Sequence, residues 1–253
     1  MSQEARNQAP STDGRMAIFD VVRGFSVISM VAFHLCYDLR FIYGFDLDFF
    51  RPPLQDVWRA SISWTFLFVA GCMCSFSRSG WKRAARYLVA AAAVWVVTTV
   101  VSVDTPISFG IIFCMGASTL LQELLYRMGF KPEGWMPALL LLVAFLLLRG
   151  VPHGTVGIGS LSVRLPRWLY ATPWLSWLGF PGPGFASGDY YPVLPFFLMY
   201  LVGACMGRHW KSVGYPAWFH RVSCRPLQFA GRHALPVYLL HQPLIMLVLE
   251  LLP

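Results

Sequence analysis

The sequence has few charged residues: Asp, Glu, Lys and Arg make up only 13% of its 253 positions. A soluble domain carries about 25% charge, because its surface faces water. Hydrophobic residues make up 57% of this chain, and its mean hydropathy is +0.56. This composition excludes a disordered chain, a collagen and a secreted disulfide scaffold. It predicts an integral membrane protein.

Lysine and cysteine are also scarce. The three lysines, Lys82, Lys131 and Lys211, all lie between the apolar runs, which excludes a retinal protein that needs a lysine in its last span. The six cysteines form no CxxC pair, so we expect neither a disulfide framework nor a metal site. The net charge of +8 falls in short clusters between apolar runs, as in a polytopic membrane protein and unlike a nucleic-acid binder.

Long apolar runs are abundant. A helix needs roughly 20 mostly apolar residues to cross the hydrocarbon. Seven segments are candidates: 17–38, 57–77, 84–103, 106–126, 136–149, 190–207 and 234–252. The fifth is short but is retained because Leu139 to Leu148 is strongly apolar. The predicted fold is therefore an all-α, polytopic transmembrane bundle of about seven spans. We expect residues 1–15 to form a disordered cytoplasmic tail and residues 16–253 to form a single transmembrane domain.

The basic residues predict the orientation. With the N-terminus inside, thirteen of the twenty Lys and Arg residues lie in inner segments and six in outer segments. Cytoplasmic loops carry such an excess. We therefore predict an N-terminus inside and a C-terminus outside.

Two predicted outer segments are long, 39–56 and 150–189. The second is rich in Gly and Pro and contains Trp168, Tyr170, Trp174 and Trp177. An aromatic belt at the headgroups explains this composition, and so does a lid over an acceptor. The sequence leaves both open.

The first span carries a polar stripe. At about 100° per residue, seven side chains fall on one face: Asp20, Arg23, Ser26, Met30, His34, Tyr37 and Asp38. Ionisable groups at membrane depth usually face a bundle interior or a watered cavity. Asp20 and Arg23 are spaced to form an ion pair, and Asp38 is spaced to orient the ring of His34 as a base. Interhelical hydrogen bonds that only hold the bundle together are the alternative.

The end of the chain carries a second polar cluster. Tyr238 and His241 share a face of the last span, and Pro243 removes one helical hydrogen bond near them. Arg232, just inside, is placed to bind a phosphate or to anchor the helix at the inner surface. Asp189 lies before the sixth span, either as its N-cap or as a wall of the cavity.

These segments resemble the heparan-α-glucosaminide N-acetyltransferase catalytic-domain family in its short bacterial form. The resemblance rests on the first span from Asp20 to Asp38 and on four further matches at 68–71, 109–111, 189–195 and 231–243. The Arg23-to-His34 interval also resembles the wider transmembrane acyltransferase superfamily. The chain departs from bacterial relatives after the Phe-Gly-Ile element, where Phe113 and Cys114 stand instead of a frequent histidine.

The resemblance implies an integral-membrane acyltransferase that moves an acetyl or other acyl group from cytoplasmic acyl-CoA to an extracytoplasmic acceptor, a sugar hydroxyl or amine. It implies His34 as the catalytic residue, supported by Arg23, and the helical spacing adds Asp38 to this catalytic set. We expect Arg232, Tyr238 and His241 to bind acetyl-CoA, which is the only cofactor expected. Acceptor binding is expected to involve four residues, namely Tyr37, Asp189, Tyr190 and Gln242. The expected location is the inner or plasma membrane.

Two questions remain open at this point. His34 acts either as general base in direct transfer, which Asp38 favours, or as an acylated nucleophile. A transporter or flippase for small-molecule or lipid-linked substrates would also need buried polar stripes and a proline-broken helix. The sequence leaves the acceptor, the acyl chain length and the choice between monomer and homodimer undetermined.

Overall fold

The computed structural model describes residues 16–77, 79–102 and 104–251, so the predicted tail at 1–15 lies outside the described residues. The helices are α1 (Ala17–Phe41), α2 (Leu54–Cys72), α3 (Gly80–Val101), α4 (Ile111–Arg127), α5 (Trp135–Leu148), α6 (Val193–Val213), α7 (Arg225–Arg232) and α8 (Ala234–Leu251). Short 3₁₀ turns are η2 (Met73–Phe76), η3 (Val151–His153), η4 (Gly159–Leu161), η5 (Arg167–Tyr170), η6 (Pro173–Leu175) and η7 (Ala217–His220). The strands β1 (Thr155–Val156) and β2 (Val163–Arg164) form a small antiparallel hairpin.

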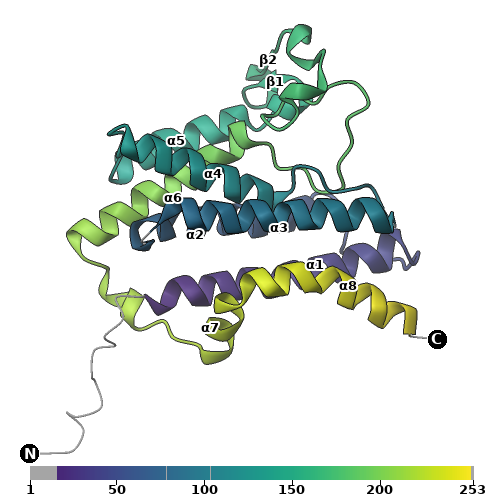
Figure 1. The fold of residues 1–253 in the computed structure, drawn as a ribbon, viewed down its shortest axis with the longest axis horizontal. Helices are drawn as coiled ribbons and strands as arrows, with labels where there is room; N and C mark the ends of the chain where they lie inside the picture. Colours follow the sequence, from purple (N-terminus) through teal and green to yellow (C-terminus); the bar gives the residue numbers. More distant parts are fainter. Residues whose placement is uncertain (1–15, 78, 103, 252–253) are drawn as a thin grey trace, which may run out of the picture.

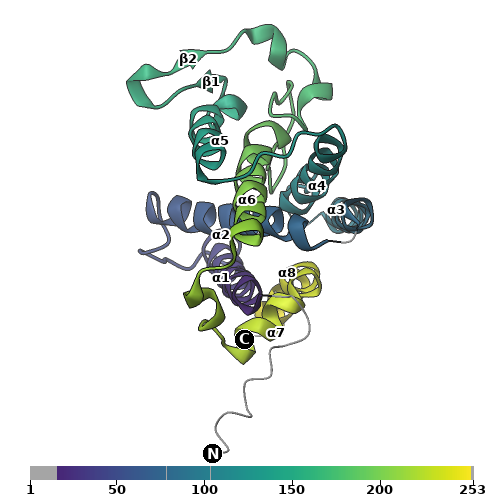
Figure 2. The same ribbon diagram turned by 90° about the vertical axis from the view of Figure 1, so that its left-hand side faces the viewer.

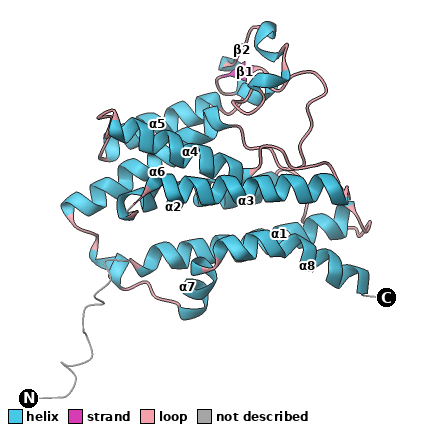
Figure 3. Ribbon diagram, in the orientation of Figure 1, coloured by secondary structure: helices cyan, strands magenta, loops and turns pink. Residues whose placement is uncertain are grey.

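The helices α1, α3 and α8 run along the longest axis of the molecule (Figure 1), whereas α2 runs across the end-on view (Figure 2). Seen end-on, α6 lies in the middle, and it packs against α2, α4 and α5 (Figure 2). On the other side of α2, α1 packs against both α7 and α8. The strands are confined to the hairpin between α5 and α6 (Figure 3). The described part of the chain is therefore mostly helical, as predicted.

Five of these segments are long and apolar enough to cross a membrane: Ala17–Phe41, Leu54–Phe76, Gly80–Val101, Trp135–His153 and Ala234–Leu251. The two other predicted spans form the helices α4 and α6. The 17 residues of α4 make it short for a span, and the last turns of α6 carry Arg208, His209 and Lys211. The short helix α7, which the sequence did not predict, precedes α8.

Glycines allow two helix pairs to approach closely. An added Cβ at Gly24 of α1 would lie 1.9 Å from the backbone oxygen of Leu227 in α7, and one at Gly231 would lie 1.9 Å from that of Asp20. Between α2 and α6, an added Cβ at Gly203 would lie 2.0 Å from the oxygen of Phe68. Small residues at such contacts are typical of helix packing in membranes.

Large apolar side chains cover the outside of the bundle. Val89 and Val100 of α3 are exposed, as are Leu140 of α5 and Leu244 of α8. Large contiguous apolar patches are rare on surfaces that face water, so these helix faces suit contact with lipid. In the segment between α5 and α6, Trp168 and Trp174 are also exposed, which is compatible with both the predicted belt and the predicted lid.

Candidate functional site

The N-terminal part of the polar stripe on α1 is an ion-pair cluster. Asp20 is 1% exposed, and one of its oxygens lies 3.3 Å from Nη1 of Arg23. Its other oxygen lies 3.5 Å from Nε of Arg232, which comes from α7. Arg23 also donates to the backbone oxygen of Gly231. The predicted pairing of Asp20 with Arg23 is confirmed, and Arg232 joins the same carboxylate.

The C-terminal part of the stripe differs from the prediction. Asp38 is fully buried, and both of its oxygens accept hydrogen bonds from Nε2 of Gln242, at 3.0 and 2.8 Å. Within the described ranges, no hydrogen bond joins Asp38 to His34. The helical spacing was right for such a bond, but α8 brings Gln242 to the carboxylate. The expectation that Asp38 orients His34 directly was therefore wrong.

His34 instead faces a second histidine. The ring centres of His34 on α1 and His241 on α8 lie 4.8 Å apart, and the rings are inclined at 62°. Nδ1 of His241 lies 2.6 Å from the backbone oxygen of Tyr238. Nε2 of His241 is buried and has no hydrogen-bond partner among the described residues. The structure thus brings together two histidines that are 207 positions apart.

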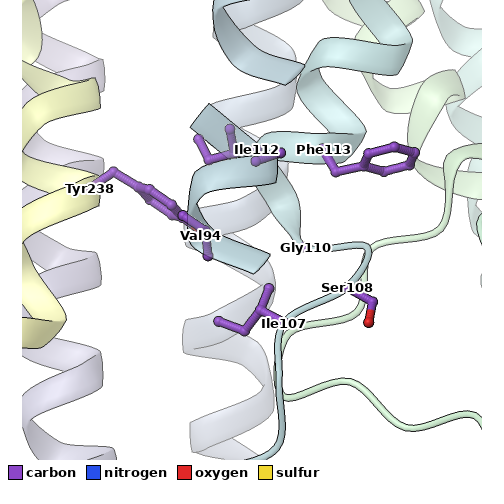
Figure 4. A pocket seen from close by; sticks show the side chains of 8 residues that line it. Val94, Ile107, Ser108, Gly110, Ile112, Phe113 and Tyr238 are labelled. Atoms are coloured by element: carbon purple, nitrogen blue, oxygen red, sulfur yellow. The ribbon is translucent and has the colours of Figure 1, made fainter. Parts of the chain in front are cut away.

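Tyr238 points towards Val94 and the start of α4 (Figure 4). It meets Val94 of α3 and Ile112 of α4 at a crevice that has room for about 10 Å³, which is a single water molecule. Phe113 lines the same crevice. Its neighbour Cys114 is buried, with Sγ 3.8 Å from Oγ of Ser118 in the next turn.

Asp189 caps a helix, although not the predicted one. Its Oδ2 accepts a hydrogen bond of 3.0 Å from the backbone N–H of Ile111, the first residue of α4. A carboxylate is stabilised at a helix N-terminus. The helix α6, whose N-cap was one of the two alternatives for Asp189, begins after Pro192 with no side-chain cap. Burial raises the pKa of Asp189 to about 6, against the lowering effects of the Ile111 N–H and of Arg59.

Tyr190 lies in an open groove beneath the segment that joins α5 and α6. The groove has a volume of about 320 Å³ and is lined by Thr105, Pro152, His153, Phe185, Ser187 and Tyr190, among others. The hydroxyl of Tyr190 donates to the backbone oxygen of Ser176, and its ring packs against Phe185 at 5.0 Å. These contacts fix one aromatic wall of the groove. Tyr37 lies apart from this wall, on α1, with its ring 4.8 Å from that of Phe41.

Sequence reasoning missed a buried polar network at the other end of the bundle. Nη2 of Arg83 donates to the hydroxyl of Tyr200 at 2.7 Å, and that hydroxyl lies 3.1 Å from Oγ1 of Thr119. The network joins α3, α6 and α4. From the sequence, Arg83 was interpreted as an ordinary charge at the inner surface. The available signal for the network was the presence of Thr119 and Tyr200 inside two apolar runs.

No group of three His, Cys, Asp or Glu side chains that could hold a metal ion occurs among the described residues. The buried cysteines Cys72, Cys114 and Cys205 are free thiols.

Comparison with protein families identifies the chain. The family described as heparan-alpha-glucosaminide N-acetyltransferase, catalytic, matches residues 15–243. The chain belongs to this family. The heparan-α-glucosaminide N-acetyltransferase family consists of membrane acetyltransferases that in general use acetyl-CoA as donor. No curated protein and no solved structure matches the sequence.

Proposed function

We propose that this family member transfers an acetyl group from cytoplasmic acyl-CoA to a sugar hydroxyl or amine on the far side of the cell membrane. The observation that carries the proposal is the meeting of His34 and His241 between α1 and α8, inside a chain that matches the family over residues 15–243. Seven spans with the N-terminus inside complete the proposal, since the basic clusters then lie mainly in the cytoplasm.

The reaction needs a base, because a neutral hydroxyl or amine is a poor nucleophile. In the proposed step, a nitrogen of His34 takes the proton as the acceptor oxygen or nitrogen attacks the thioester carbonyl. The carbon–sulfur bond then breaks, and the proton passes to the departing CoA sulfur. Direct transfer of this kind needs no covalent enzyme intermediate. Arg23 and Asp38 support it from a distance, Arg23 by neutralising Asp20 and Asp38 by holding Gln242.

The donor enters from the inner end. Arg232 is half exposed and already lies beside Arg23 at the shared carboxylate, so the pair offers positive charge to the phosphates of CoA. Arg23 and His34 are eleven residues apart, or about 16 Å along α1 at the usual helical rise. The acyl arm would cover that distance beside α8, where Tyr238 and His241 lie on the route.

The acceptor enters from the outer end. Four residues are proposed to bind the acceptor there. Tyr37 and Gln242 lie near Asp38, Asp189 lies at the start of α4, and Tyr190 lies in the groove. Aromatic walls with neighbouring hydroxyl groups, such as Tyr190 with Ser187, suit a sugar ring, which has apolar faces and a polar edge.

Sealed inside-out vesicles provide the test. Acetyl-CoA labelled in the acetyl group is added outside, where the cytoplasmic face is exposed, and a soluble amino sugar is enclosed in the lumen. We expect labelled acetyl on the enclosed sugar, with CoA thiol released outside. Protein that binds no acetyl-CoA at all would overturn the proposal and favour the transporter.

A further inference from the structure

The tautomer of His241 follows from its backbone contact. The partner of Nδ1 is the carbonyl oxygen of Tyr238, 2.6 Å away, and a carbonyl oxygen can only accept. Nδ1 must therefore carry the hydrogen. In a neutral imidazole the other nitrogen then holds a lone pair, so Nε2 of His241 is a buried hydrogen-bond acceptor.

This lone pair needs a donor. Nε2 of His241 has no hydrogen-bond partner among the described residues, and leaving a buried polar atom unsatisfied costs about 1–3 kcal/mol. The neighbouring amide oxygen of Gln242 is another acceptor and cannot serve. His34 is the nearest ring, and among the described residues it makes no hydrogen bond of its own.

The separation of the rings allows the missing bond. A distance of 4.8 Å between ring centres permits a hydrogen bond of about 3 Å between one nitrogen of each ring. Rotation about the second side-chain torsion of histidine is soft, so His34 can turn an N–H towards Nε2 of His241 without moving α1.

We infer that His241 is a positioning residue for His34 and fills the orienting role that the sequence assigned to Asp38. His34 donates to Nε2 of His241, which donates in turn to the carbonyl of Tyr238. The other nitrogen of His34 is thereby fixed as a lone pair towards the acceptor. When His34 takes the acceptor's proton, the positive charge is shared with a neutral, hydrogen-bonded imidazole, until the proton leaves with the CoA sulfur.

The inference rests on the proposed function, but it also predicts a property of the protein without substrate, namely the tautomer of His34. His34 is held in one tautomer only while His241 offers a lone pair. Partners of this kind, one step removed from the reacting group, are worth about 10–100-fold in activity in metal sites, where the same histidine logic applies.

Two substitutions separate positioning from packing. His241→Phe keeps an aromatic ring against His34 and removes the acceptor, whereas His241→Gln keeps an acceptor oxygen. We expect kcat for acetyl transfer to fall about 10–100-fold in His241→Phe and to recover in large part in His241→Gln. The KM for acetyl-CoA should change much less than kcat, because the CoA phosphates bind at Arg232 in the proposed function. Leu240→Ala, on the exposed face of α8, serves as the control and keeps the wild-type kcat.

Ring-nitrogen NMR of histidine-labelled protein in detergent gives a readout independent of activity. We expect one tautomer for His34 in the wild type and in His241→Gln, and a mixture of tautomers in His241→Phe. A wild-type kcat in His241→Phe would overturn the inference, and so would equal losses in both variants with unchanged His34 signals. If the wild type transferred no acetyl group, the proposed function would fail, while these spectra would still decide the hydrogen bond.

Discussion

At the scale of single residues, the buried carboxylate of Asp20 depends on its charged neighbours, because it is 1% exposed and lies between two guanidinium groups. Removing one partner of a buried pair costs about 3–5 kcal/mol. We predict that Arg23→Ala destabilises the protein by about 3 kcal/mol, at the low end because Arg232 remains. Unfolding in detergent as a function of added denaturant measures the loss.

A double-mutant cycle tests the cause of that loss. Asp20→Asn removes the charge that Arg23 neutralises, so the combined Asp20→Asn/Arg23→Ala variant should be more stable than Arg23→Ala alone. If the two losses simply added, the ion pair would contribute nothing and the account of this cluster would be wrong.

Asp189 is predicted to make stability depend on pH. Its pKa is raised by burial to about 6, whereas in the unfolded chain an aspartate titrates near pH 3.9. Between about pH 4 and pH 6 the folded state therefore holds a proton that the unfolded state releases, so this residue lowers stability as the pH rises through that window.

The substitution Asp189→Asn keeps an acceptor for the Ile111 N–H and removes the titration. Thermal unfolding from pH 4 to pH 7 should lose this part of its pH dependence in Asp189→Asn and keep it in Asp48→Asn, which changes an exposed carboxylate. An unchanged pH dependence in Asp189→Asn would show that the carboxyl titrates normally.

The sequence predicted the contacts of Asp20 and Arg23 in the polar stripe, but not those of His34 and Asp38. Asp20 and Arg23 pair within one helix, so their spacing was sufficient. The partners of Asp38 and His34 come from α8, 204 and 207 positions away, and depend on the rotation and register of that helix against α1. Helical periodicity carries no information on either.

At the scale of helices, the contact between α2 and α6 depends on Gly203. A methyl group there would lie 2.0 Å from the backbone oxygen of Phe68, and backbone cannot move aside as a side chain can. We predict that Gly203→Ala costs about 1–3 kcal/mol, as overpacking usually does, seen as a lower melting temperature in detergent. Ala92→Val adds volume on an exposed face of α3 and should change little; an equal loss in both would point to a general effect of volume.

Element boundaries were predictable where composition changes sharply. All seven long helices overlap predicted spans, because apolar runs of that length have few alternatives. The helix α7 was missed, since eight residues that include Arg225, Gln228 and Arg232 are too short and too polar to give a span signal. Adjacency in sequence suggested the N-cap of α6 as one of two roles for Asp189, whereas its side chain accepts from the first residue of α4.

For the whole molecule, the orientation predicts where thiols can be labelled. Cys224, just before α7, should react with an impermeant thiol reagent only after the membrane is opened, because inner segments carry most of the basic residues. Ser160→Cys in a Cys224→Ser background places a thiol in the exposed outer segment and should react in intact cells. The reverse pattern would invert the topology.

The central claim, that the histidines between α1 and α8 form the transfer site, is tested most directly by single-turnover transfer from labelled acetyl-CoA. Wild type and His34→Ala are compared, with acetyl-CoA binding measured on the same preparations. We predict that His34→Ala transfers about 10²–10⁴-fold more slowly, as expected for loss of a positioned base, while its affinity for acetyl-CoA stays near that of the wild type. A His34→Ala protein that transfers at the wild-type rate would contradict the account.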